Sequence, residues 1–382
     1  MKTVKELIFF TSGSADNAST WSNIPYLFCR ELERQGVKLH KVNLSNRFFG
    51  MLWEKCYRRP LKFLLKPIHY EPVYYGYSWL SHWLGERRIK KAVSRWANAD
   101  CCIFIGYQHA NRYSSIPSLL LSDWTTDVTI SLKNLPEKPY RGCIRREHEA
   151  MKKATHVVSI FQLQAEKMQK DVPEARVCFL GGNVINSFYD GVLDGNLLVE
   201  KKKKSRKILF IGRKTSYMEA ARILVDAVVK AHETDSHMEL DIIGIEENDF
   251  TQPLPDYVRC HGFLRKDIEK ERSLYYTLLM EASVLVNVMP KWAAYSSTIE
   301  AMFFYTPVVV SPYQEFVHEF GENIPFGIYN RDFSISGVAN DIISVLLASH
   351  YDNMCIEAHQ AVESYTWENY VQRILNLIEE KT

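Results

Sequence analysis

Residues 287–311 read NVMPKWAAYSSTIEAMFFYTPVVVS and predict a loop, a helix and a strand in succession. The apolar run 282–288 leads into this stretch and is typical of a buried parallel strand. Ser-Ser-Thr at 296–298 suits a helix N-terminus, and Pro307 ends the helix before a β-branched strand. The order of strand, loop, helix and strand indicates an α/β fold with a parallel sheet.

The chemistry of this stretch lies where the predicted helix begins. Free backbone N–H groups and the positive end of the helix dipole make an anion site there, suited to phosphate. Glu300, one turn into the helix, is placed to accept hydrogen bonds from vicinal hydroxyls such as those of a ribose. A simpler interpretation fits the same residues: the Ser-Ser-Thr run only caps a core helix, and Glu300 only complements its dipole.

The composition bounds the classes of protein to consider. With 382 residues, 46% of them hydrophobic, the chain is long enough for two globular domains. Its formal net charge of +2 argues against a general nucleic-acid binder. No apolar run is long enough to span a bilayer, and the first residues lead into a predicted strand rather than a signal peptide, so we expect a cytoplasmic protein. The eight cysteines form no CxxC pair, which favours reduced structural thiols, and we expect no metal.

Both halves of the chain open with the same pattern of elements. The first predicts a strand over 6–11, a helix over 21–35 and a strand over 38–43. The second repeats strand, turn, helix and strand over 208–243, and this repetition is typical of two Rossmann-like domains. The basic run KKKKSRK at 201–207 marks the boundary and predicts an exposed linker, or else a contact for anionic lipid or phosphate.

Residues 300–309 resemble the nucleotide-sugar segment of the retaining glycosyltransferases of family 4, whose double-Rossmann fold is called GT-B. In that family a Glu-x7-Glu motif precedes Ala-Met and, after a few small residues, Thr-Pro-Val-Val. Here Glu300, Ala301 and Met302 are followed by Thr-Pro-Val-Val at 306–309, and Trp292 stands in place of the first Glu. The resemblance covers nearly the whole second half, and the first half only in outline.

The resemblance implies a donor site in the second half. The family clamps the diphosphate with a Gly-Arg turn and a following Lys; Arg213 fits, Met218 stands at the Lys position, and Lys214 is the available substitute. Without a bound metal, the charge that grows on the leaving diphosphate must be met by such cations and by helix-end N–H groups. The implied donor-binding residues are Gly212, Arg213, Lys214, Phe263, Leu264, Ser296, Ser297, Thr298 and Glu300.

The first half is implied to hold the acceptor. Asp123 and His109 follow predicted strands where the family usually places a catalytic-face residue, and they are the candidate catalytic residues, although either also fits a simple loop cap. A small polar loop follows the first strand, and in the family this loop lies against the donor phosphates or the acceptor. It has no GxGxxG pattern, so an ordinary turn also fits. Its residues are Ser12, Gly13 and Ser14.

Two further segments bear on partners and domain order. Residues 48–68, FFGMLWEKCYRRPLKFLLKPI, alternate apolar and basic side chains, as in segments that lie on an anionic membrane surface; a helix pair with a solvated basic face fits equally. Tyr-Thr-Trp-Glu at 365–368 resembles the family's signal before a helix that crosses back to the first domain. We therefore expect a GT-B fold with an acceptor domain over 1–200, a donor domain over 201–365 facing it across a cleft, and a terminal helix over 366–382.

The sequence thus predicts a glycosyltransferase that moves a sugar from a nucleotide-diphosphate donor to a glycan or lipid-linked acceptor, with retention, in bacterial surface polysaccharide synthesis. We expect no cofactor besides the donor and no nucleic-acid partner. Two other interpretations stay open. One is a nucleotide-sugar epimerase of the same fold. The other is a non-catalytic, membrane-docked subunit that binds nucleotide sugars, and the missing first Glu and missing Lys make it credible.

Overall fold

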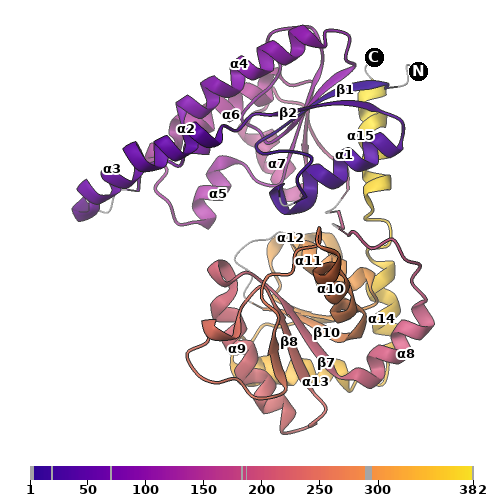
Figure 1. Ribbon diagram of the computed structural model, residues 1–382. Coiled ribbons are helices and arrows are strands. Elements are labelled where there is room, and N and C mark those ends of the chain that lie inside the picture. The colour runs from indigo at the N-terminus through magenta and orange to yellow at the C-terminus, as the bar shows by residue number, and fades with distance from the viewer. Residues whose placement is uncertain are drawn as a thin grey trace. The chain divides into compact units, whose positions relative to one another are not determined.

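The computed structural model describes residues 4–18, 20–68, 71–181, 184–185, 187–288 and 295–380. The chain divides into two compact units, which we call unit 1 (Met1–Gly182 with Trp367–Thr382) and unit 2 (Asn183–Thr366). Over the described residues, each unit contains one sheet of six parallel strands with helices packed around it (Figure 1). The predicted architecture of two Rossmann-like units is confirmed.

The sheet of unit 1 has the strand order β2-β1-β3-β4-β5-β6. β3 and β4 are buried along their whole length, as expected for central strands of a parallel sheet covered on both faces. The strands are β1 Glu6–Thr11, β2 Lys38–Asn43, β3 Cys101–Ile105, β4 Ser118–Ser122, β5 His156–Ser159 and β6 Val177–Phe179. The helices packed around them are α1 Ile24–Arg34, α4 Trp79–Arg95, α5 Thr126–Leu132, α6 Arg141–Lys153, α7 Gln162–Asp171 and α15 Trp367–Glu379.

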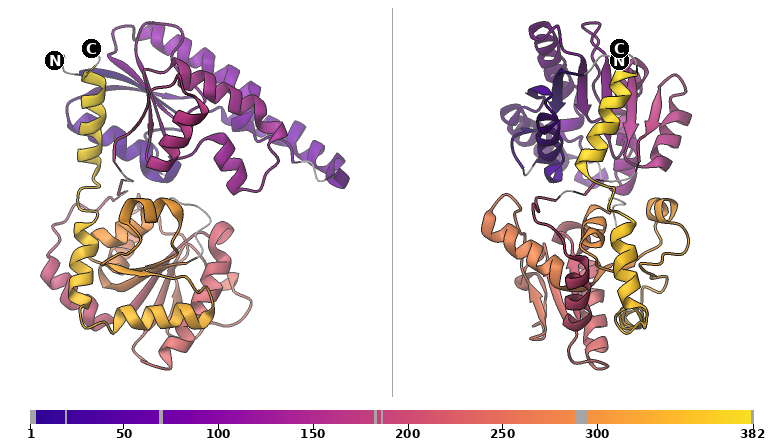
Figure 2. Two further views of the ribbon diagram at one scale, coloured as in Figure 1. Left: turned by 180° about the vertical axis from the view of Figure 1, so that it is seen from behind. Right: turned by 90° about the vertical axis from the view of Figure 1, so that its right-hand side faces the viewer.

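The last of these helices, α15, returns from the end of unit 2 to unit 1 (Figure 2). It packs on α1, where the Trp367 ring stacks on Phe28 with the ring centroids 5.4 Å apart. Tyr370, Val371 and Ile374 are buried along the same helix. The expectation that a terminal helix crosses back to the first domain is therefore confirmed.

Residues 47–68 form a helical arm that extends away from the sheet of unit 1 (Figures 1 and 2). Its helix continues without a break through a π-helical turn, so the predicted amphipathic segment is helical over most of its length. Within the described ranges, none of the helices combines the length and apolar character needed to cross a bilayer. The parts of the arm are α2 Arg47–Leu52, the π turn Trp53–Arg58, α3 Arg59–Leu64 and a 3-10 turn Lys66–Ile68.

The sheet of unit 2 has the order β12-β11-β10-β7-β8-β9, the doubly wound order of dinucleotide-binding folds. The strands are β7 Lys207–Ile211, β8 Glu239–Ile243, β9 Val258–Cys260, β10 Ala282–Asn287, β11 Val308–Val310 and β12 Gly327–Tyr329. The helices are α8 Gly195–Ser205, α9 Lys214–His232, α10 Glu269–Glu281, α11 Ser296–Phe303, α12 Gln314–Phe320, α13 Ile335–Leu346 and α14 Tyr351–Gln360.

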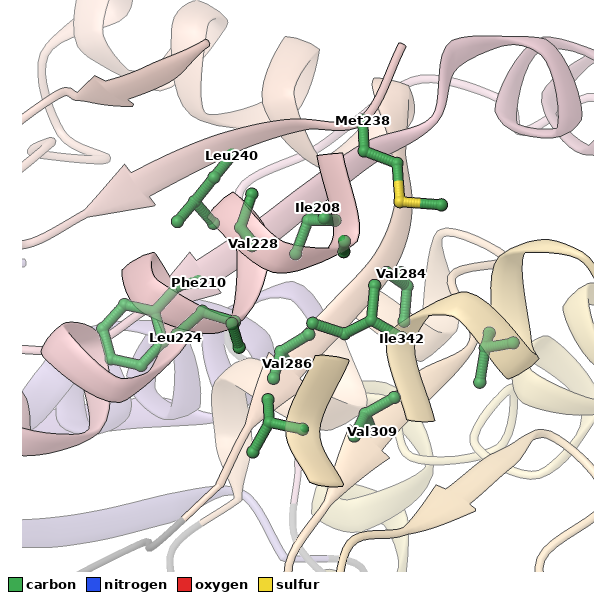
Figure 3. Close-up of a cluster of buried hydrophobic side chains, with 14 of the residues drawn as sticks. Ile208, Phe210, Leu224, Val228, Met238, Leu240, Val284, Val286, Val309 and Ile342 are labelled. Carbon is green, nitrogen blue, oxygen red and sulfur yellow. The ribbon is translucent and has the colours of Figure 1, made fainter. Parts of the chain in front are cut away.

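The core of unit 2 forms where α9 and α13 pack on this sheet. Phe210 and Val286 come from neighbouring strands, Leu224 and Val228 from α9, and Ile342 from α13 (Figure 3). All are fully or almost fully buried. Continuous apolar strands such as 282–288 are thus explained by burial on both faces of a parallel sheet.

The basic run 201–207 is not an exposed linker. Its first part lies in α8 and its last residue opens β7. Lys202 is fully buried and donates hydrogen bonds to the carbonyl oxygens of Leu279 at 2.7 Å and Ala282 at 2.8 Å, and to Thr306 Oγ1 at 3.0 Å. Charge alone suggested exposure, but two carbonyl oxygens at the end of α10 and the Thr306 hydroxyl satisfy this ammonium inside the unit.

Candidate functional site

Two loops of unit 2 leave the sheet where its strand order reverses, between β7 and β10. These strands pair in parallel, so the loops that follow them leave the same edge of the sheet. Doubly wound folds bind ligands at such a switch point. α9 begins after the first loop at Lys214, and α11 begins after the second at Ser296. Residues 289–294, which include Trp292, lie outside the described residues.

The loop after β7 is a tight turn that packs backbone against backbone. A Cβ on Gly244, at the end of β8, would lie 2.5 Å from the carbonyl oxygen of Gly212. Gly244 also has φ at +97°, a conformation that glycine adopts at little cost. The close approach fixes the position of the next residue, Arg213, whose side chain is exposed at the N-cap of α9.

Arg213 lies beside the predicted base-binding loop after β9. Its guanidinium carbon is 5.7 Å from the centroid of the Phe263 ring, which is 62% exposed, and Leu264 is half-buried next in the chain. Lys214 has a different neighbour: its Nζ lies 2.5 Å from Asp249 Oδ1, and this contact lowers the pKa of the Asp249 carboxyl. Arg213 therefore contacts an exposed aromatic ring, whereas Lys214 forms an ion pair with Asp249.

Glu300 is buried within unit 2 and surrounded by donors. Its Oε2 lies 2.5 Å from Lys266 Nζ and accepts a hydrogen bond from the Tyr275 hydroxyl at 2.9 Å. Its Oε1 lies 2.8 Å from the same ammonium. Burial, and then the charge of Glu300, raise the pKa of the Tyr275 hydroxyl well above its usual value. Glu300 is thus the centre of a polar cluster and more than a partner for a helix dipole.

No motif in the sequence marks Lys266, Tyr275 or Tyr276. Lys266 lies in the loop after β9, three positions beyond Phe263, and the tyrosines lie on α10. A basic residue in a loop and two tyrosines in a helix match no motif, so only the fold shows that they face Glu300.

The helix tip predicted at Ser296–Thr298 is present, because α11 begins at Ser296. The N-cap position belongs to Tyr295, whose buried ring packs edge-on to Phe316 at 5.3 Å. Ser296 and Ser297 are half-buried, whereas Thr298 is fully buried with its Oγ1 3.4 Å from Asn287 Nδ2. Thr298 thus links the start of α11 to the end of β10, and the two serines stay closer to the surface.

The switch point of unit 1 lies between β1 and β3. After β1 the chain turns at Gly13, which has φ at +120° and donates its N–H to Asn43 Oδ1 at 3.0 Å. Ser12 and Ser14 are exposed on either side of it. The predicted loop therefore lies at the edge of the sheet where ligands of this fold class bind.

His109 and Asp123 follow neighbouring strands of unit 1 and have separate partners. His109 Nδ1 lies 2.8 Å from Glu86 Oε1, and a Cβ on Gly85 would lie 2.9 Å from His109 Nε2. Asp123 accepts a hydrogen bond from the Trp124 N–H at 2.8 Å, and burial raises the pKa of its carboxyl. The contacts of Asp123 are those of a loop cap, and the catalytic role of either residue stays a prediction.

His82, Glu86 and His109 each place one candidate metal-ligand atom within 4.8 Å of the others. Glu86, however, also lies 3.1 Å from Arg112 Nε and accepts a hydrogen bond from the Tyr113 hydroxyl at 2.9 Å. The two imidazole rings are stacked, with their planes 7° apart and their centroids 4.6 Å apart. Nitrogen lone pairs in stacked parallel rings do not converge on one ion. The cluster is therefore arranged as a set of ion pairs and hydrogen bonds.

No protein-family model matches the chain, and the comparison with curated proteins found no relative. Solved structures do match its whole length. Sucrose-phosphate synthase from Thermosynechococcus elongatus is 13% identical with a TM-score of 0.64, over 99% of each chain. HepE from Anabaena, solved with UDP and glucose, is 13% identical with a TM-score of 0.63, over 98% of this chain and 100% of that one.

A further match is a mutant of TarM from S. aureus, solved with fondaparinux, α-GlcNAc-glycerol and UDP. It is 13% identical with a TM-score of 0.53, and the match covers 77% of this chain but only 59% of the TarM chain. These likenesses, with the two doubly wound units, show that the chain has the GT-B fold of glycosyltransferases.

Proposed function

We propose that the chain is a glycosyltransferase that takes a sugar from a nucleotide-diphosphate donor, with UDP as the first candidate nucleotide, and delivers it to a glycan or lipid-linked acceptor. One observation carries this proposal. The Gly212–Arg213 turn contacts the Phe263 loop, and the same loop reaches Glu300 through Lys266, so these groups form one connected set in unit 2. HepE and TarM, which share the fold, were solved with UDP.

Each part of this set suits one part of a nucleotide sugar. Arg213 and the start of α11 would meet the diphosphate, Phe263 and Leu264 the base, and Glu300 the ribose. Fixed cations and helix-end N–H groups would stabilise the charge on the leaving diphosphate, so we propose transfer without a metal ion. Unit 1 would hold the acceptor near Ser12, Gly13 and Ser14, with His109 and Asp123 as its candidate catalytic residues.

The finer parts of the proposal rest on the resemblance of residues 300–309 to the family 4 enzymes. They are retention of configuration at the transferred sugar and a role in bacterial surface polysaccharide synthesis. A transfer product identified by NMR would test the first, because the anomeric coupling reports the configuration of the new linkage.

A thermal-shift screen of UDP, GDP, CMP and their sugars tests the donor site. A ligand that binds only the folded chain at 100 times its Kd stabilises it by about 2.7 kcal/mol. We expect one nucleotide to stabilise the wild type, and Arg213→Ala to remove that shift. Arg222→Ala is the matched control, because Arg222 is an exposed arginine further along α9. If no nucleotide stabilises the wild type or the Arg222→Ala control, the proposed donor site is wrong.

Turnover then separates the enzyme from its alternatives. Transfer or slow hydrolysis of the bound donor supports a glycosyltransferase. Conversion of one nucleotide sugar into its epimer would instead identify the epimerase. Binding with no turnover of any donor would favour the non-catalytic subunit, for which Met218 at the expected Lys position is the specific sequence observation.

We also propose that the helical arm of unit 1 contacts an anionic membrane. Its apolar side chains are exposed where a folded protein would normally bury them: 80% of Phe63, 69% of Leu64 and 59% of Phe48 are exposed. Cations interleave with them, and each adds roughly 1 kcal/mol of attraction to an anionic surface. The exposed cations are Lys55, Arg59, Lys62 and Lys66.

Vesicle sedimentation tests this contact. We expect the wild type to bind vesicles containing phosphatidylglycerol more tightly than neutral phosphatidylcholine vesicles, and Phe63→Ser with Leu64→Ser to weaken that binding about tenfold or more. Leu197→Ser is the matched control, because Leu197 is a 63% exposed leucine on α8 of unit 2. Equal binding by both variants would show that the arm is not the contact.

A further inference from the structure

The partners of Glu300 leave almost no acceptor capacity for a ligand. An ionised carboxylate offers about four lone-pair sites. The Lys266 ammonium lies 2.8 and 2.5 Å from the two oxygens, and the hydroxyls of Tyr275 and Tyr276 lie at 2.9 and 3.5 Å. A ribose diol donates two hydrogen bonds, so it cannot bind Glu300 while all these contacts persist. Binding at this carboxylate requires one partner to leave.

Lys266 is the partner best placed to leave. The tyrosines are buried on α10, and the Tyr276 ring stacks on Phe304 with centroids 5.6 Å apart. Lys266 instead lies on the loop between β9 and α10, and 12% of its side chain is exposed compared with 3% for Glu300. A lysine stem is also flexible and its ammonium forms hydrogen bonds without a fixed geometry.

A displaced ammonium needs another anion, because separating a buried ion pair leaves an uncompensated charge. The loop that carries Lys266 also carries Phe263, which lies against Arg213. A nucleoside diphosphate that reached from Glu300 to Arg213 would bring two phosphate groups along this line. The other cation of the turn, Lys214, already pairs with Asp249.

We infer that Lys266 is an exchangeable counter-ion of Glu300: it neutralises the carboxylate in the empty site and pairs with the ligand's diphosphate when the ribose binds. This inference rests on the proposed function of unit 2. Both groups keep hydrogen-bond partners in the two states, because the carboxylate exchanges an ammonium for two hydroxyl donors while the ammonium exchanges a carboxylate for phosphate oxygens. Lys266 is then a specificity residue that favours nucleoside diphosphates over nucleosides.

The affinities of UDP and uridine for the full chain, measured by calorimetry, test the exchange. Lys266→Met should weaken UDP binding about tenfold or more, because a charge-assisted contact is lost. The same variant should bind uridine as well as the wild type or better, because the carboxylate is no longer occupied. Glu300→Gln should weaken both ligands by a similar factor. Of these two single substitutions, only Lys266→Met should therefore reduce the preference for UDP over uridine.

Two further variants keep the test decisive. Lys266→Met with Glu300→Gln removes both charges, so it avoids an unpaired buried carboxylate if the single variant folds poorly, and it should also lose the preference for UDP. Arg265→Met is the matched control, because Arg265 is the preceding cation, pairs with Asp267 and should leave both affinities unchanged.

The possible outcomes are distinct. Equal losses of UDP and uridine binding in Lys266→Met would show a static structural ion pair and overturn the exchange. Unchanged UDP binding would overturn it as well, while leaving the donor site intact. A wild type that binds neither UDP nor the other nucleoside diphosphates of the screen would reject the proposed function, and the exchange with it.

Discussion

The two units have sheets of the same type and differ in where the strand order reverses. In unit 2 the reversal lies between β7 and β10, and in unit 1 between β1 and β3. The loops at the first place carry Arg213 and lead to the buried Glu300. Those at the second carry exposed serines and a histidine held by Glu86. One architecture thus presents an arginine and a buried carboxylate in one unit, and exposed serines with a carboxylate-paired histidine in the other.

The same contrast appears in the buried ionisable groups. In unit 2, Lys202 donates to the carbonyl oxygen of Leu279 near the C-terminal end of α10. In unit 1, Glu147 accepts hydrogen bonds from the Thr126 N–H at 2.8 Å and from the Thr126 hydroxyl at 2.5 Å, at the N-terminal end of α5. Each charge suits the helix end that it meets, because the dipole is negative at the C-terminus and positive at the N-terminus. Each unit therefore uses a buried ionisable group to complete a helix end.

The largest effect expected from this comparison is the loss of Lys202. Lys202→Ala leaves the acceptors at Leu279, Ala282 and Thr306 without their donor and opens a cavity, so we expect unit 2 to lose about 3–5 kcal/mol of stability. Urea denaturation followed by hydrogen exchange of unit 2 peptides would measure it. Lys203→Ala is the control, because its exposed ammonium pairs with Asp352 at the surface and should matter little. Equal effects of the two variants would contradict the buried role.

The second prediction concerns unit 1 and the helix that returns to it. Ile374 is fully buried on α15, so Ile374→Ala should destabilise unit 1 by about 2–4 kcal/mol. Exchange should accelerate in peptides of α1 and β1 and stay unchanged in those of β7 and β8. Gln372→Ala, an exposed position on the same helix, should have no measurable effect. If hydrogen exchange became faster only in peptides of unit 2, α15 would stabilise unit 2 rather than unit 1, contrary to this prediction.

The third prediction is that the two buried charges give opposite pH dependences. Burial raises the pKa of Glu147 from 4.5 to about 7, so in this window folded unit 1 keeps a proton that the unfolded chain loses, and its stability falls as pH rises. Burial lowers the pKa of Lys202 from 10.5 to about 7, so the unfolded chain keeps the proton between these values and the stability of unit 2 rises with pH.

Each slope should approach about 1.4 kcal/mol per pH unit within its window. Urea denaturation of the wild type from about pH 5 to about pH 10 would measure both slopes. Glu147→Gln should flatten only the first and Lys202→Met only the second. Slopes of the same sign in both units, or slopes that survive these substitutions, would contradict the assignment.

Much of the fold could be predicted from sequence because it depends on local patterns. The apolar run 282–288 predicted a strand, which is β10, and the Thr-Pro-Val-Val run at 306–309 predicted the next strand, which is β11. The basic run 201–207 was misjudged because composition does not show that α10 ends beside Lys202. Helix periodicity alone did not reveal that this position faces inward.

The candidate site was predicted only where a motif marks it. Arg213 and Glu300 belong to patterns with a known spacing, whereas Lys266 and Tyr275 reach Glu300 from parts of the chain that no local pattern connects. In unit 1, His109 was identified without its partner Glu86, which lies 23 residues earlier on α4. Contacts between distant segments depend on the tertiary fold, and a single sequence does not display them.

The smallest expected effect is the change in stability of unit 1 when an exposed residue of the arm is replaced. Phe63 is 80% exposed, so Phe63→Ala removes almost no buried area and should change the stability of unit 1 by less than about 0.5 kcal/mol. Phe104→Ala in β3 is the contrasting control, since that buried ring should cost about 3–5 kcal/mol. Urea denaturation of both variants measures the difference. A large loss for Phe63→Ala would mean that the ring packs within the protein in solution, and the membrane contact would lose its main support. A negligible loss leaves an apolar side chain that contributes nothing to folding, which is the property expected of a surface that binds something else.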